Sequence, residues 1–520
     1  MATLIEALLQ PTAYDHPVGS IDLIETHISW ILLTGDYAYK LRKPVNLGFV
    51  DFSTPERRHW FSLEELRLNR RLAPDLYLDV RSIHGPVQSA HLGGTGPVID
   101  TVVKMRQFHQ TQLLPAVLER DELTSSQFEH LAGDLARFHS EAAIAAPESG
   151  FGSALAVTAP ALANLEVLAQ HAPERLERPA LETWTRSEAL RLADHFQQRL
   201  LQGAVREGHG DLHLGNMFLS EGRIRVFDCL EFSPALRWID VISDVAFLAM
   251  DLRQRGRSDL AGVLLDHWLQ DTGDYTGLGA WRWYGVYRAL VRAKVAALRL
   301  SQTSAAAVVA NSSRELHRYL AEASDWAAAP PGQLVLCHGV SGSGKSHLAK
   351  QLCRQLGWIR LCSDIERRRL FGRWTGLVAC APLSGDPYRP EVHELLFGEL
   401  LPRAAELALR AGQSLIVDAT FLRRRDRQCF QQLAERCSAR FHILDCRIRF
   451  DLAAARIRRR QEQGLDPSEA TIDVLQAQWH QRDPLDPADL EHTLPLDCNT
   501  DLTRERWQWL LTTLGAKSAT

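Results

Sequence analysis

A glycine-rich run in the last third of the chain has the residue types and spacing of a phosphate-binding loop. It fits the pattern GxxxxGK[ST] and lies between an apolar, strand-like stretch at 334–337 and a helix-compatible stretch at 347–356. The residues expected to contact a nucleotide are Gly339, Ser341, Gly342, Ser343, Gly344, Lys345 and Ser346. Both flanking elements disfavour the alternative of a glycine-rich turn that only happens to precede a helix.

The chemistry of such a loop explains why these residue types are needed. Glycines let the backbone wrap a phosphate, and N–H groups at a helix N-terminus donate hydrogen bonds to its oxygens. Lys345 would neutralise charge on the β- and γ-phosphates during transfer, and the Ser346 hydroxyl would ligate Mg²⁺. ATP and Mg²⁺ are therefore the expected cofactors.

Two aspartates follow the next predicted strands, at the edge where a parallel sheet places its chemistry. Asp364 follows the strand 358–362, and Asp418 follows the strand 414–417. We expect Asp364 to position or deprotonate the acceptor and Asp418 to hold the shell of the metal ion. Each has an alternative role as a helix N-cap, because Asp between a strand and a helix is common.

Arginines supply a further candidate contact to the nucleotide. Arg456 and Arg460 lie four residues apart on a predicted helix that is followed by residues 463–467. This helix would be a lid whose guanidinium groups meet the transferring phosphoryl group. The alternative for any one arginine run is a solvated helical face.

A second set of residues, earlier in the chain, has the spacing HxDxxxxN. It comprises His209, Asp211 and Asn216, and Asp228 follows at the end of a predicted hairpin, 217–227. Asp211 can accept the proton of an acceptor hydroxyl, while the other two oxygen donors can bind the Mg²⁺ that bridges nucleotide phosphates. His209 is expected to buttress the loop. The alternative is an Asp- and Asn-rich turn before a hairpin, without chemistry.

A site of this kind also needs a lysine on the phosphates and a helical glutamate that holds it. Lys40 is the candidate and Lys43 the alternative, and either Glu64 or Glu65 is the expected partner. The backbone near Met105 would contact adenine. Lysine and helical glutamate are common on surfaces, so that interpretation stays open, and no GxGxxG precedes Lys40.

The earlier set resembles the aminoglycoside phosphotransferase family. The run His209–Asn216 matches its HGDLHxGN motif, and Asp228 is followed by Asp240 and Asp244 in a D-x3-D-[VL]-A pattern. The likeness is strongest over 200–250 and weaker from about 25 to 325. It implies a kinase-like fold, with Asp240 and Asp244 as structural supports.

Residues 333–500 resemble the small P-loop kinases of the predicted AAA-type group, relatives of gluconate kinase, zeta toxin and polynucleotide 5′-kinases. The likeness rests on the loop at 339–346, the ends of the next two strands and the arginine-bearing helix. It implies phosphoryl transfer without identifying the acceptor. The whole chain resembles bifunctional proteins in which these two modules are fused in this order.

The elements that must position these residues fall into two groups. Short strands and then a mostly helical region beyond 125 indicate an α+β, protein-kinase-like fold. The last third indicates an α/β fold with a parallel sheet, because apolar strands alternate with helices at 334–337, 358–362, 414–417 and 441–446. Pro330 and Pro331 place the boundary near 328, which predicts domains at 1–328 and 329–520.

Composition agrees with a chain of two or more domains. It has 520 residues, of which 45% are hydrophobic and 23% charged. Residues 331–520 hold 27 Lys and Arg against 23 Asp and Glu, so the net charge of −4 leaves −8 on the first 330 residues. No run approaches ~18 apolar residues, and the N-terminus does not resemble a secretion signal, so no membrane span is expected.

Nine scattered cysteines without a CxxC pair are typical of a reducing cytoplasm rather than of disulfides or zinc. The sequence therefore predicts a cytoplasmic ATP-dependent phosphotransferase with two ATP sites, acting on hydroxyl groups of small molecules. In one alternative, the first domain is a nucleotide-binding regulator and the second is the only kinase. In another, the second domain acts on nucleic-acid ends, which its small net charge disfavours.

Overall fold

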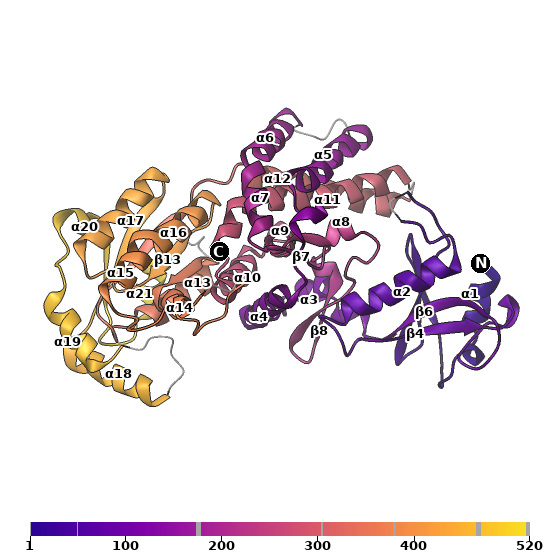
Figure 1. Ribbon diagram of the computed structural model, residues 1–520, viewed down its shortest axis with the longest axis horizontal. Coiled ribbons are helices and arrows are strands. Elements are labelled where there is room, and N and C mark those ends of the chain that lie inside the picture. The colour runs from indigo at the N-terminus through magenta and orange to yellow at the C-terminus, as the bar shows by residue number, and fades with distance from the viewer. Residues whose placement is uncertain are drawn as a thin grey trace. The chain divides into compact units, whose positions relative to one another are not determined.

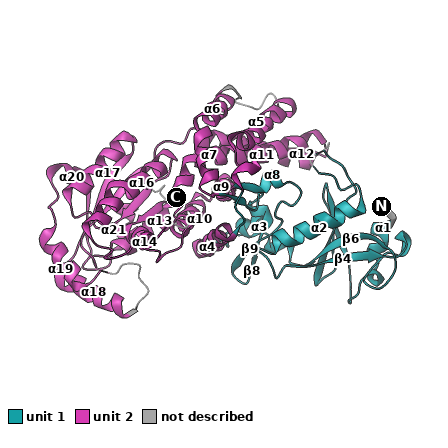
Figure 2. Ribbon diagram, viewed as in Figure 1, with its two compact units in different colours: residues 1–123, 142–145, 205–239 teal, residues 124–141, 146–204, 240–520 magenta. Residues whose placement is uncertain are grey.

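The computed structural model describes residues 2–48, 50–172, 178–302, 305–377, 381–463 and 470–515 (Figure 1). The chain forms two compact units (Figure 2). The first comprises residues 1–123, 142–145 and 205–239, and the second comprises 124–141, 146–204 and 240–520.

The first unit is built on a six-stranded antiparallel sheet with the order β1-β2-β3-β6-β4-β5. Its strands are β1 (Asp22–Glu25), β2 (Ser29–Leu33), β3 (Tyr37–Arg42), β4 (Tyr77–His84), β5 (His91–Leu92) and β6 (Val98–Arg106). Helix α2 (Pro55–Asn69) packs on β6 and β4. It begins where the Thr54 hydroxyl accepts a hydrogen bond from the Arg57 N–H and Pro55 pre-sets the first turn.

The remainder of the first unit carries the HxDxxxxN loop and a hairpin. Strands β7 (Val205–Glu207) and β10 (Trp238–Asp240) pair, and the hairpin consists of β8 (Met217–Ser220) and β9 (Arg223–Val226). Both residues of its turn, Glu221 and Gly222, have positive φ, which matches the twist of a two-residue hairpin. The short helices of this unit are α1 (Ala2–Leu8), α3 (Leu114–Glu119) and α8 (Pro234–Arg237).

The second unit contains a helical region and a sheet. Its helical region consists of α4 (Ser125–Glu141), α5 (Ala154–His171), α6 (Arg178–Arg191), α7 (Ala193–Leu201), α9 (Val241–Gln254), α10 (Ser258–Thr272), α11 (Trp281–Gln302) and α12 (Ala306–Ala327). A buried charge cluster holds it together: the Arg199 guanidinium donates to Asp240 at 2.7 Å and also to Asp274. Asp240 in addition caps α9 by accepting from the Ile242 N–H.

A parallel sheet of five strands follows, with the order β12-β13-β11-β14-β15. The strands are β11 (Gln333–His338), β12 (Ile359–Cys362), β13 (Leu415–Asp418), β14 (Arg440–Arg447) and β15 (Thr493–Asp497). The helices are α13 (Lys345–Leu356), α14 (Ser363–Leu370), α15 (Pro390–Glu394), α16 (Leu401–Arg410), α17 (Arg424–Arg436), α18 (Phe450–Gln463), α19 (Ile472–Gln481), α20 (Pro487–Glu491) and α21 (Arg504–Thr513). The central strands β11 and β13 are buried except at Gln333, which explains the apolar runs 334–337 and 415–417.

The predicted fold class is confirmed in both parts: a kinase-like α+β part precedes a parallel α/β part. Of the five parallel strands, the sequence prediction missed β15, where apolar and polar residues show no continuous apolar run. Among the described residues, one segment, Pro147–His171, is long and apolar enough to cross a membrane by length and composition alone. It includes α5, which packs against α11 of the helical region.

Candidate active sites

The first site centres on Lys40, which β3 places between two carboxylates. Its ammonium group donates to Glu65 Oε1 at 2.9 Å and to Asp228 Oδ1 at 2.8 Å. Burial would lower the pKa of Lys40, but the carboxylates of Asp228 and Glu65 raise it well above its usual value. Lys40 therefore stays charged, as a lysine that binds phosphate must.

Helix α2 presents Glu65 rather than Glu64 to this lysine. Glu65 is fully buried and also accepts from Arg42 at 2.6 Å. Glu64 instead pairs with Arg67 and Arg237, each at 2.7 Å. The alternative lysine, Lys43, pairs with Glu25, so Lys40 and Glu65 are the pair that the structure brings together, and the prediction of Glu64 is corrected.

The HxDxxxxN loop brings Asp211 and Asn216 into direct contact. The Asn216 side-chain amide donates to the Asp211 carboxylate and to its backbone carbonyl, both at 3.0 Å. His209 Nδ1 accepts from the Asp211 N–H at 3.2 Å, which leaves Nε2–H to donate to the Phe227 carbonyl at 3.0 Å. His209 therefore joins the loop to the end of the hairpin, as the sequence predicts.

Asp228 lies beside Asn216 because the hairpin β8–β9 closes between them. Met217 pairs with Val226, and the Phe227 N–H donates to the Asn216 carbonyl at 3.0 Å. Asp228 has a φ of 62°, a costly conformation for a residue other than glycine, and residues held in that way cluster at functional sites. The side chains offer carboxylate and amide oxygens, the donors that Mg²⁺ prefers, so the set fits this ion.

Met105 lies on β6, opposite Ala38 of β3 and Tyr77 of β4. Its side chain packs against a buried cluster that contains Tyr77, Val103 and Phe218, and the rings of Phe108 and Phe218 stack at a centroid distance of 4.2 Å. The next two backbone amides already donate, from Arg106 to Leu76 and from Gln107 to Asp36. A contact from these two residues to adenine would therefore use their carbonyl groups.

The second site is the loop between β11 and α13. Gly339, Gly342 and Gly344 have φ values of 138°, 82° and 94°, so glycine is favoured at all three. A Cβ at Gly339 would lie 2.7 Å from the Cys446 carbonyl, and one at Gly342 would lie 2.6 Å from the Ala453 carbonyl. The backbone is thus free of side chains where it would wrap a phosphate, which fits a nucleotide.

Lys345, Ser346 and Asp418 meet at the start of α13. The Ser346 hydroxyl donates to Asp418 Oδ1 at 3.0 Å, and Lys345 Nζ donates to the Val340 carbonyl at 2.7 Å. Burial raises the pKa of Asp418, while the charges of Arg360 and Lys345 act in the opposite direction. A hydroxyl and a carboxylate in contact at the phosphate-binding loop fit an Mg²⁺ shell.

Asp364 lies in the first turn of α14, where it accepts from Arg367 at 2.6 Å. Its side chain does not cap this helix, which begins after Cys362 without a side-chain cap. The nearby arginines Arg367, Arg368 and Arg373 line a small pocket with Asp364 and Tyr388. The positive arginine side chains suit an anionic acceptor. Asp364 remains a candidate for contact with the hydroxyl group of the acceptor.

The two arginines of α18 have different surroundings. Arg456 NH1 would lie 3.4 Å from a Cβ at Gly344, so this side chain is at the phosphate-binding loop, and NH2 donates to the Cys498 carbonyl at 2.9 Å. Arg460 donates to the Ala470 carbonyl at 3.2 Å. Of the segment 463–467 predicted to follow the lid helix, residues 464–467 lie outside the described residues.

Sequence reasoning missed two side chains that contact this site. Gln478 of α19 accepts from the Ser341 N–H at 2.7 Å, and Arg360 of β12 donates to Asp418 at 3.2 Å. Neither belongs to a motif, and only the fold brings them to the loop. Within the described ranges, no group of three or more His, Cys, Asp or Glu side chains is placed to hold a metal ion.

Fold and sites together define a two-part protein, with a kinase-like part followed by a P-loop part. The phosphotransferase enzyme family matches residues 63–287, and an AAA domain family matches residues 334–485. "Uncharacterized protein Rv2004c" of Mycobacterium tuberculosis is 32% identical over 480 residues, which cover 89% of this chain and 92% of the relative. A Mycobacterium bovis protein, "Uncharacterized protein Mb2027c", matches to the same extent. The chain belongs to the family in which these two domains are fused.

Solved structures resemble one part each. A choline/ethanolamine kinase family protein from Mesorhizobium loti is 12% identical, with a TM-score of 0.35, and the match covers 62% of this chain and 98% of that chain. A gluconokinase from Sinorhizobium meliloti is 20% identical, with a TM-score of 0.25, and the match covers 35% of this chain and 91% of that chain.

Proposed function

We propose that this chain is an ATP- and Mg²⁺-dependent phosphotransferase with two nucleotide sites, each transferring a phosphoryl group to a hydroxyl group of a small molecule. One observation carries the proposal. In the first site Lys40 contacts the metal-binding candidate Asp228, and in the second Ser346 contacts the metal-binding candidate Asp418. Each part thus brings together side chains that could bind phosphate or a metal ion, which supports the proposal.

In the first site, Asp211 is the proposed base. Its carboxylate would accept the proton of the acceptor hydroxyl as the oxygen attacks the γ-phosphate. The Asn216 amide donates to that carboxylate and so fixes its orientation. Asn216 and Asp228 would supply oxygen ligands to Mg²⁺, and Lys40, held by Glu65, would bind phosphate oxygens.

In the second site, the loop backbone and Lys345 would bind the phosphates, and Ser346 and Asp418 would hold the metal shell. Mg²⁺ would supply neutralisation of charge on the nucleotide phosphates. Arg456 would bind a phosphoryl oxygen, and its position beside Gly344 supports this role. Asp364, in the first turn of α14 after strand β12, would position or deprotonate the acceptor.

A second candidate function makes the first part a regulator and the second part the only kinase. The absence of a GxGxxG motif before Lys40 favours the regulator, because a shorter loop would then cover the phosphates of the nucleotide. The intact set of Asp211, Asn216 and Asp228 favours catalysis instead. The proposal also includes a domain boundary near residue 328 and a cytoplasmic location. The small net charge of the second domain disfavours action on nucleic-acid ends.

The test is ATP consumption with a panel of sugars, amino alcohols, aminocyclitols and nucleosides. Wild type, Asp211→Ala and Lys345→Ala are run in parallel with the full chain. An acceptor of the first site loses turnover only in Asp211→Ala, and an acceptor of the second only in Lys345→Ala. Turnover that survives the combined variant contradicts the proposal. If no acceptor depends on Asp211 and first-site ATP changes P-loop turnover, the regulator is favoured.

A further inference from the structure

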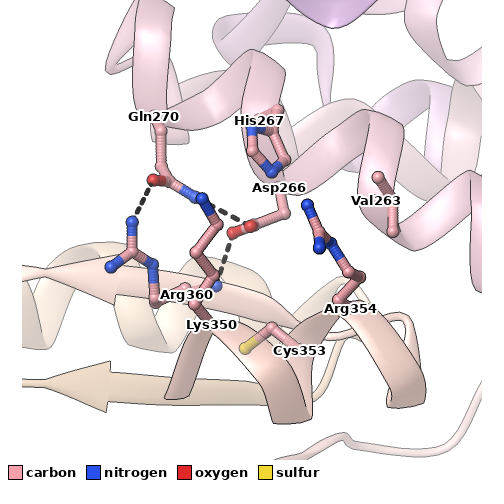
Figure 3. A pocket seen from close by; sticks show the side chains of 8 residues that line it. All are labelled: Val263, Asp266, His267, Gln270, Lys350, Cys353, Arg354 and Arg360. Atoms are coloured by element: carbon pink, nitrogen blue, oxygen red, sulfur yellow. Dashed lines mark hydrogen bonds between the residues drawn. The ribbon is translucent and has the colours of Figure 1, made fainter. Parts of the chain in front are cut away.

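Helix α10 of the helical region contacts Arg360 of β12 through Gln270 (Figure 3). All the residues involved belong to the second compact unit. Arg360 of β12 donates through NH2 to Gln270 Oε1 at 2.6 Å and through NH1 to Asp418 Oδ2 at 3.2 Å. One guanidinium group thus contacts both α10 and the carboxylate proposed to hold the metal shell.

A third residue fixes the direction of the Gln270 amide. Its Nε2 donates to Asp266 Oδ2 at 2.7 Å, so Oε1 must face Arg360 (Figure 3). The other oxygen of Asp266 accepts from the Arg360 backbone N–H at 2.6 Å. Asp266, Gln270 and Arg360 therefore form a closed set of three hydrogen bonds, and the Nε–H of Arg360 has no partner among the described residues.

Burial makes this set costly to rearrange. Asp266 and Gln270 are each 6% exposed, and Asp418 is 3% exposed, so an unpaired polar group there would lack water as a partner. The contact between α10 and α13 is also close, because a Cβ on Gly262 would clash with the backbone of Gly357. The Trp374 indole N–H in addition donates to the Gln270 carbonyl at 2.9 Å.

The two oxygens of Asp418 are thus divided between two partners. Oδ1 accepts from Ser346, and Oδ2 accepts from Arg360. We propose that Arg360 is a positioning residue for the P-loop site, that Gln270 and Asp266 of α10 hold it, and that Mg²⁺-dependent nucleotide binding at the loop therefore depends on a helix outside the P-loop part. This inference rests on the proposed role of Asp418.

The test measures Mg²⁺-dependent ATP binding by the full chain carrying Asp228→Ala, which removes a proposed ligand of the first site. Gln270→Leu deletes both hydrogen bonds at nearly constant volume. Asp266→Asn makes the Gln270 amide turn its donor toward Arg360. Each is expected to raise the Mg²⁺ concentration for half-saturation by about 10- to 100-fold, the usual effect of losing a partner of a metal ligand. Binding of ATP without Mg²⁺ should change far less.

Two further variants separate positioning from a general loss of packing. In Asp266→Asn combined with Gln270→Glu, the new amide donates to the new carboxylate, which again accepts from Arg360, so Mg²⁺ dependence should recover. Arg354→Ala is the matched control. Arg354 lies on α13 and donates to Glu129 of α4 at 2.6 Å, so the change removes an arginine from the same contact surface without touching Asp418.

Each outcome decides the matter. Wild-type Mg²⁺ dependence in Gln270→Leu and Asp266→Asn overturns the inference, as does an equal effect of Arg354→Ala. An equal loss of metal-free binding, without recovery in the combined variant, also overturns it. If the parent chain shows no Mg²⁺-dependent ATP binding that Lys345→Ala abolishes, the proposed function of this site is wrong instead. Thermal unfolding of every variant identifies one that fails to fold, and the combined variant then decides.

Discussion

Lys40 Nζ lies 2.8 Å from Asp228 Oδ1, although 188 residues separate the two in the chain. The contact joins the residue proposed to bind phosphate to a residue proposed to bind metal, so both would act on one nucleotide. Strand β3 fixes the lysine, and the close of hairpin β8–β9 fixes the aspartate.

Lys40→Ala should abolish most transfer at the first site while Lys43→Ala leaves it near wild type. The expected loss is about 10²-fold, because a fixed positive charge on the phosphates is removed from a shielded site. Both lysines lie close together in the chain, but Lys43 pairs with Glu25. Initial rates are measured with a first-site acceptor, in a Lys345→Ala background. Equal losses in the two variants would mean that Lys40 has no special role.

Asp211→Asn separates a catalyst from a regulator. The new side-chain oxygen can still accept from the Asn216 amide, so the metal ligand should keep its orientation. ATP affinity should therefore stay within a few-fold of wild type, whereas transfer should fall by about 10²-fold or more, the usual contribution of a general base. Calorimetric titration and a transfer assay measure the two quantities. Unchanged transfer would show that Asp211 is not the base.

Sequence patterns selected the candidate residues of both sites because motifs fix short spacings. The loop at 339–346 and the run from His209 to Asn216 are each a short continuous segment. Their residue types and spacing therefore suggest how the side chains lie. A sequence motif could not decide whether Glu64 or Glu65 contacts Lys40. Neighbouring residues on a helix point about 100° apart, and only the packing of α2 on the sheet decides which is buried.

Contacts between distant elements could not be predicted at all. In the sequence, Arg360 is an ordinary polar residue of a short strand, and Gln478 is an ordinary polar residue of an amphipathic helix. Each gains its role from tertiary packing, which brings α10 to β12 and α19 to the phosphate-binding loop. Most of the parallel sheet was predictable because its strands are rich in apolar residues, whereas edge strand β15 has one buried residue, and its other residues are half-buried or exposed.

Lys345→Ala should abolish nucleotide turnover at the P-loop site without unfolding the chain. The loss should reach several kcal/mol of transition-state stabilisation, roughly 10²-fold or more in rate. Lys350→Ala is the matched control, because this lysine lies on the same helix and is exposed. Turnover is followed in the full chain carrying Asp211→Ala, with circular dichroism as the check on folding. Near-normal rates in Lys345→Ala would contradict the assignment of the loop at 339–346 as a nucleotide site.

Cys498 should be the most reactive of the described thiols whose pKa is shifted. A hydrogen bond with the Cys446 thiol lowers the pKa of Cys498, and the guanidinium of Arg456 acts in the same direction against burial. Burial instead raises the pKa of Cys429, which is also partly exposed.

Because the thiolate is the nucleophile, alkylation of Cys498 should reach half its maximal rate at a lower pH than alkylation of Cys429. Iodoacetamide labelling between about pH 6 and about pH 10 brackets the usual thiol pKa. Peptide mass spectrometry then measures both rates. Saturating Mg-ATP should slow only Cys498, because Arg456 contacts its carbonyl and lies beside Gly344. Faster labelling of Cys429, or equal protection of both thiols by nucleotide, would contradict the placement of Cys498 at the phosphate-binding loop.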